Sequence, residues 1–131
     1  MSTAVGNGDL VRGLYRAFSE RDRAALDELI AEEAIWHVPG RNPLAGEHRG
    51  RLAVLAYFDA LVQRTGGTFR AELIDVLASD TRAVAIARSS GKRDGKQYDG
   101  LNCLLLTIER DQIAEAWLMP ADPFALDAFL A

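Results

Sequence analysis

The chain is poor in the residues that most often hold metals or act as nucleophiles. Its 131 residues include one cysteine, Cys103, and two histidines, His37 and His48. A lone cysteine cannot form an internal disulfide, and the two histidines lack a metal-ligand spacing. No Gly-rich phosphate loop follows a predicted strand, and no Gly-x-Ser-x-Gly nucleophile elbow occurs. We therefore expect no metal and no cofactor.

Long apolar runs and basic patches are also missing. No run approaches the ~20 residues that span a bilayer, and residues 1–9 lack the basic and apolar regions of a signal peptide. The net charge is -4 with scattered Lys and Arg, which argues against a nucleic-acid surface. We predict a cytoplasmic protein with a flexible N-terminus, residues 1–9, one domain, residues 10–131, and no membrane or nucleic-acid partner.

The first half of the chain has helical periodicity. Four residues recur at helical spacing and predict a helix over about residues 10–20: Val11, Leu14, Tyr15 and Phe18. Asp22 is placed to cap a second helix, and a third is predicted over about residues 51–64. A strand around Trp36 lies between the last two and stops at Pro39, which is followed by glycine.

The second half is predicted to form strands over residues 69–77, 83–89, 97–108 and 113–119, before a short helix that opens at Asp122. The dipeptide Asp94-Gly95 is a strong hairpin signal. Helices followed by hairpin-linked strands predict an α+β fold in which the helices pack on one face of an antiparallel sheet.

Two predicted strands are apolar on both faces. Along residues 101–108 the two faces carry Leu101, Cys103 and Leu105, and Leu104, Leu106 and Ile108; residues 73–77 are similar. An antiparallel sheet with one face in water should alternate apolar and polar residues, and the helices can cover only one face. We therefore predict a homodimer that buries the other face of the sheet.

Several short segments, in this order and at these spacings, resemble the nuclear transport factor 2-like superfamily. They are Tyr15–Phe18, Arg21-Asp22, Glu32–Gly40, Leu44–Gly46 with Arg49-Gly50, and Asp111–Trp117. Within this superfamily the chain is most similar to the SnoaL-like (polyketide-cyclase-like) and ketosteroid-isomerase-like branch. The resemblance implies a cystatin-like α+β roll: a cone-shaped bent sheet, with the N-terminal helices on its concave face, around a mostly apolar pocket.

The same resemblance suggests two catalytic residues. His37 falls where steroid-isomerase-like members carry their carboxylate base, and a neutral imidazole can also accept a proton. Asp122 lies close to the acidic base of polyketide-cyclase-like members. Both have structural alternatives. His37 could hydrogen-bond the loop at Pro39, and Asp122, which precedes Pro123, could cap the last helix.

The expected ligand-binding residues are Tyr15, Trp36, Phe58, Asn102 and Trp117. Trp36 and His37 are neighbours on one strand, so only one of them can point straight inward. The tyrosine of isomerase-like relatives falls on Leu14 rather than Tyr15. Their protonated acid is replaced by the pair Asn102-Cys103, of which Asn102 can donate a hydrogen bond. The resemblance therefore does not reproduce the isomerase oxyanion pair.

Two functions follow as expectations. The first is a cofactor-independent isomerase, cyclase or hydratase-type enzyme that acts on a small hydrophobic metabolite by proton transfer. The second is a non-catalytic module with the same fold that binds a ligand or acts as a dimeric partner. The family contains both kinds of protein, so the fold alone does not decide between them.

Overall fold

The first helix is longer than the sequence pattern predicts. In the computed structural model, which describes residues 3–131, α1 spans Ala4–Glu20. Thr3 caps it by accepting a hydrogen bond from the Gly6 amide at 3.0 Å. Asn7 is 1% exposed and donates to the Ser79 carbonyl at 2.9 Å. Residues 4–9, which were predicted as part of a flexible N-terminus, are the first residues of α1 in the structure; Met1 and Ser2 lie outside the described residues.

The next elements follow the predicted order, with one addition. They are α2 (Arg23–Leu29), β1 (Ile30–Val38), β2 (Gly46–Arg49) and α3 (Arg51–Arg64). Asp22 caps α2 by accepting from the Ala25 amide at 3.1 Å. The strand β2 was not predicted, because it is short and polar and opens on a glycine.

The remaining strands are joined by tight turns: β3 (Arg70–Ala78), β4 (Arg82–Arg93), β5 (Lys96–Glu109) and β6 (Gln112–Pro120), followed by α4 (Pro123–Leu130). Asp94 and Gly95 have φ angles of 50° and 76° between paired Arg93 and Lys96, so the predicted hairpin is confirmed.

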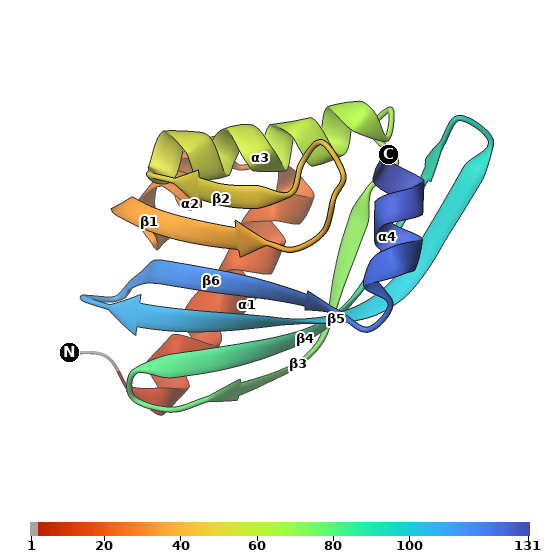
Figure 1. Ribbon diagram of the computed structural model, residues 1–131. Coiled ribbons are helices and arrows are strands. Elements are labelled where there is room, and N and C mark those ends of the chain that lie inside the picture. The colour runs from red at the N-terminus through yellow and green to blue at the C-terminus, as the bar shows by residue number, and fades with distance from the viewer. Residues whose placement is uncertain (1–2) are drawn as a thin grey trace.

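The strands form one sheet in the order β2-β1-β6-β5-β4-β3. The sheet is curved and unclosed (Figure 1), and the α+β fold class is confirmed. One pair departs from the antiparallel prediction: β1 lies parallel to β6, with His37 opposite Trp117. These strands are far apart in sequence, so the chain between them is long enough for a parallel connection.

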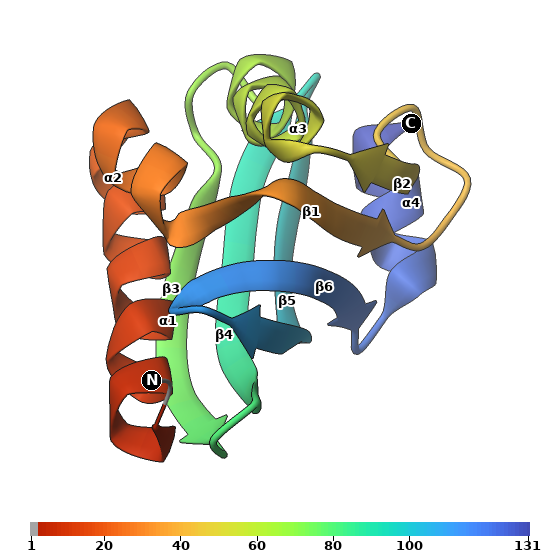
Figure 2. The ribbon, with the colours of Figure 1, turned by 90° about the vertical axis from the view of Figure 1, so that its left-hand side faces the viewer.

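The helices gather on the concave side of the sheet (Figure 2), where α1 packs on β3 and β4, and α3 packs on β1 and β2. The short α4 lies against β5 and β6 at one end of the molecule. No helix packs on the opposite face of the sheet within residues 3–131. Within that same range, the helices are too short or too polar to cross a membrane.

Candidate functional site

Two neighbouring residues of β1 point to opposite faces of the sheet. Trp36 faces the helices, is 3% exposed, and packs edge-to-face on Phe58 of α3 with ring centroids 5.3 Å apart. His37 faces away from them and stacks on Trp117 of β6, with centroids 5.1 Å apart and planes inclined by 8°. Side chains alternate along a strand, so Trp36 on the inside requires His37 on the outside.

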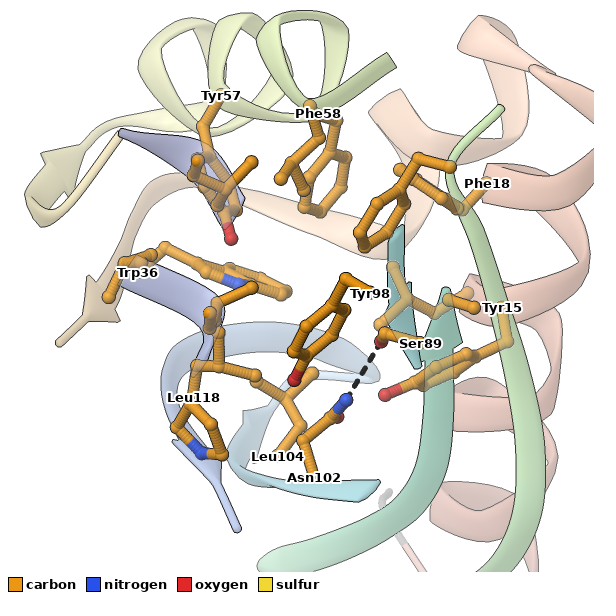
Figure 3. Close-up of a pocket in the computed structure, with 18 residues that line it drawn as sticks. Tyr15, Phe18, Trp36, Tyr57, Phe58, Ser89, Tyr98, Asn102, Leu104 and Leu118 are labelled. Carbon is orange, nitrogen blue, oxygen red and sulfur yellow. Dashed lines mark hydrogen bonds between the residues drawn. The ribbon is translucent and has the colours of Figure 1, made fainter. Parts of the chain in front are cut away.

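A pocket lies between the concave face of the sheet and the helices (Figure 3). Its walls come from α1, α3, α4 and each strand except β2. Within residues 3–131, seven aromatic side chains line it: Tyr15, Phe18, Trp36, Tyr57, Phe58, Phe69 and Tyr98. The space amounts to about 790 Å³ when the part open to solvent is included. An apolar molecule held between these rings would lose contact with water, which favours binding.

The neutral polar side chains of Tyr15, Ser89, Tyr98 and Asn102 gather on one side of the pocket. Asn102 of β5 donates from its amide nitrogen to the Ser89 hydroxyl of β4 at 2.8 Å. Figure 3 shows the hydroxyls of Tyr15 and Tyr98 pointing toward this pair. Ser89 keeps its own proton to donate, and Asn102 keeps one N–H and its carbonyl oxygen. This group can therefore both donate to and accept from a ligand.

Burial keeps the tyrosines protonated. It raises the pKa of Tyr15 and of Tyr57 far above the ordinary value, because the phenolate would lose its hydration. It also raises the pKa of Tyr98, with a further contribution from the charges of Asp122 and Asp99. Within the described part of the chain, these three hydroxyls have no hydrogen-bond partner, and no carboxylate, imidazole or cationic side chain lines the pocket. The tyrosines are therefore available as neutral donors.

Two of these tyrosines are positioned by specific neighbours. Tyr98 stacks on Phe129 of α4 with centroids 5.5 Å apart, and its ring lies over Gly100 on the same face of β5. A side chain at Gly100 would collide with the Tyr98 hydroxyl, so the glycine makes room for the ring. Tyr57 stacks on His48 of β2, whose Nε2 lies 2.8 Å from the Leu44 carbonyl.

The predicted placement of His37 in the pocket is wrong. Its Nε2 lies 2.5 Å from a carboxylate oxygen of Glu115, and its Nδ1 lies 3.4 Å from one of Glu47. Both carboxylates are on the outer face of the sheet, beside Trp117. The alternation of β1 allowed one inward residue, and the larger, more apolar Trp36 takes that position.

The predicted pocket positions of Trp117 and Asp122 are wrong as well. Trp117 shares the outer face with His37, its neighbour in the sheet. Asp122 caps α4 by accepting from the Ala125 amide at 3.1 Å, with Pro123 in the first turn, so its helix-cap alternative is the one observed. Neither residue is part of the pocket wall, where β6 contributes Leu118 and Pro120 instead.

Four of the expected ligand-binding residues do line the pocket: Tyr15, Trp36, Phe58 and Asn102. Three further lining residues were not predicted: Ser89, Tyr57 and Tyr98. A signal for Tyr98 was present, because it lies four residues before Asn102 on the same strand and therefore faces the same side. Ser89 needed the register between β4 and β5, which no local pattern gives. Within residues 3–131 no cluster of side chains suits a metal ion.

The chain matches the model of the SnoaL-like domain over residues 11–116. It is 34% identical over 124 residues to an uncharacterised protein of Mycobacterium tuberculosis, covering 94% of this chain and 95% of the relative. Among solved structures it is similar to Bal32a, from a soil-derived mobile gene cassette (38% identity, TM-score 0.95, 98% of each chain). It is also similar to a Xanthomonas campestris protein of unknown function with a cystatin-like fold (30% identity, TM-score 0.88, 94% and 96% of the chains). The chain therefore belongs to the SnoaL-like family.

Proposed function

We propose that this SnoaL-like protein binds a small, largely apolar molecule that carries a carbonyl or hydroxyl oxygen. The observation that carries the proposal is the combination of aromatic pocket walls with neutral hydrogen-bonding groups at Tyr15, Ser89, Tyr98 and Asn102. The aromatic walls would bury the body of the ligand, and the polar groups would fix its oxygen.

The reaction that such a site serves best is one in which the ligand oxygen gains negative charge, as in a cofactor-independent isomerisation or ring closure. Tyr15 and Asn102 would donate hydrogen bonds to that oxygen in an environment of low dielectric, where such bonds are strong. The roles first expected of His37 and Asp122 are not part of this proposal, because neither residue lines the pocket.

A non-catalytic binding protein is the second candidate, and one observation favours it. Over residues 3–131 the pocket lining offers no carboxylate or imidazole to take a proton from carbon. Any proton transfer would then have to use water or a group of the ligand itself.

A screen followed by an exchange measurement tests both candidates. Hydrophobic ketones, lactones and epoxides are screened by thermal shift, since a ligand that binds the folded state raises the melting temperature. Ketones that bind are then incubated with the protein in D2O, and exchange of the protons next to the carbonyl is followed by NMR. Faster exchange that is lost in Tyr15→Phe supports the enzyme. Binding without faster exchange supports the binding protein, and no binding at all contradicts both.

We also propose that a second copy of the chain covers the outer face of the sheet. Three adjacent strands place apolar side chains there: Val84 and Ile86 of β4, Leu101 and Leu105 of β5, and Trp117 and Met119 of β6. Leu101 is 40% and Met119 is 49% exposed in the single chain. A two-fold contact would bury the same patch on both copies. Light scattering at micromolar concentration should give twice the chain mass.

A further inference from the structure

A second cavity lies where the end of α1, the end of α3 and the start of β3 meet, and two arginines line it. Arg21 follows α1 directly and has a φ of 56°. Arg70 is the first residue of β3. Both side chains reach the same backbone oxygen: the Gly67 carbonyl accepts from Arg21 at 3.5 Å and from Arg70 at 2.9 Å. Two positive charges are therefore held close together beside one cavity.

These two charges have no acidic partner of their own. Among the described residues, no carboxylate lies within 4.0 Å of either guanidinium group. Glu72 also lines the cavity, and its strand position places it opposite Arg88 of β4, whose own salt bridge is to Asp99 at 2.9 Å. Both side chains are exposed to solvent, and guanidinium groups bind carboxylates and phosphates with paired hydrogen bonds.

The second cavity shares a wall with the main pocket. Phe18, Phe69 and Ala71 line both spaces. Phe18 and Phe69 meet edge-to-face with centroids 6.1 Å apart, and Figure 3 shows Phe18 beside the ribbon that leads into β3. One layer of side chains therefore separates the apolar pocket from the two arginines. A ligand that spans both spaces therefore requires this layer of side chains to open.

From this arrangement we propose that the ligand is acidic: its apolar body occupies the main pocket, and its carboxylate or phosphate lies between Arg21 and Arg70. The proposal names the class of molecule that the proposed function leaves open, and it rests on that function for the apolar body. The capped ends of α1 and α3 do not oppose it, because their last carbonyls already accept backbone hydrogen bonds, as Ala17 does from the Asp22 amide at 2.8 Å.

The test compares an acid with its ester. Binding of 4-phenylbutanoate and of methyl 4-phenylbutanoate is measured by calorimetry with the wild-type protein and with the double variant Arg21→Gln/Arg70→Gln. We expect the acid to bind at least about tenfold more tightly than the ester, since charge-assisted hydrogen bonds are strong. The double variant should lose this preference and keep its affinity for the ester. The matched control is Arg12→Gln/Arg16→Gln, which removes the same charge from exposed positions of α1 and should keep the preference.

A titration with inorganic phosphate, followed by NMR, tests the arginine site without the main pocket. The backbone amide of Gly67 and the side-chain Nε–H signals of Arg21 and Arg70 should shift in the wild type, and the Gly67 amide should not shift in the Arg21→Gln/Arg70→Gln variant. No shift in the wild type overturns the proposal, whatever the main pocket binds. Shifts with phosphate but equal binding of acid and ester overturn the link between the two cavities. Shifts with phosphate, but binding of neither 4-phenylbutanoate nor its ester and no binding in the ketone screen, contradict the proposed function and with it the apolar half of this inference.

Discussion

The two faces of the sheet carry opposite kinds of chemistry. On the concave face, Trp36 and Asn102 belong to a pocket whose polar groups are neutral. On the outer face, His37 lies between the carboxylates of Glu47 and Glu115. A shift of one residue along β1 separates the two environments. A titratable residue at the position of a relative's catalytic base therefore belongs to the pocket only if its side chain points to the inner face of the sheet.

The largest expected difference between the faces is in stability. Trp36→Ala removes a large buried ring that packs on Phe58, so we expect the free energy of unfolding to fall by about 3–5 kcal/mol. His37→Ala, its neighbour on the outer face, should lose less than about 1 kcal/mol, because His37 and its contacts with Glu47 and Glu115 are partly exposed to solvent. Urea unfolding of both variants measures this, and equal losses would contradict the assignment of the two faces.

The second prediction concerns the apolar part of the outer face. Leu105→Glu places a charge at the centre of the proposed dimer contact, where an unpaired buried charge costs about 3–5 kcal/mol. We expect the variant to be monomeric in analytical ultracentrifugation. The control is Leu52→Glu on α3, which makes the same substitution at an exposed position (76% exposed) away from the sheet, whereas Leu105 is partly buried in the single chain. A monomeric wild type at micromolar concentration would sink the dimer proposal.

The third prediction compares ligand affinity in variants of the pocket face with affinity in a variant of the outer face. For a ketone found in the screen, Tyr15→Phe and Asn102→Leu should each weaken binding about tenfold, or about 1.4 kcal/mol, because each removes a donor from the pocket. His37→Phe should leave the affinity unchanged. If His37→Phe weakens binding as much as Tyr15→Phe, the ligand lies elsewhere than in this pocket.

The sequence predicted the order of the elements well, because helical spacing, caps and the Asp94-Gly95 turn are local signals. It predicted both faces of residues 101–108 as apolar, and the structure divides them: Leu104 lines the pocket, and Leu105 pairs with Val84 and Trp117 on the other face. The short strand β2 had no such signal, since its length and polarity are those of a loop.

The site was harder to predict than the fold. The family resemblance placed His37 and Asp122 at or close to positions where relatives carry a catalytic base. The direction of a side chain, however, depends on strand register and on what packs beside it. The parallel pairing of β1 with β6 brings His37 to Trp117 and Glu115, and this long-range contact has no local pattern. Phe58 was predictable because apolar spacing places it on the inner face of its helix, whereas Asn102 was suggested by the family resemblance.

The last prediction concerns the hydrogen bonds that join α4 to the loop after β1. Asp127 of α4, whose neighbours Leu126 and Leu130 line the pocket, accepts from the Arg41 amide at 3.1 Å and from the Asn42 side chain at 2.8 Å, in the loop after β1. The Asn42 hydrogen bond, followed by that of the Arg41 amide, lowers the pKa of the Asp127 carboxyl. A lowered pKa in the folded state means that the carboxylate contributes stability above its ordinary pKa, and that this contribution is lost as the pH falls through the folded value. We therefore expect a small effect: between pH 5 and pH 2, the melting temperature of Asp127→Asn should fall less steeply than that of the wild type.

The control is Asp9→Asn, which removes an exposed carboxylate from α1 and should follow the wild type more closely. If the two variants have the same slope, Asp127 does not hold the loop to α4 in solution.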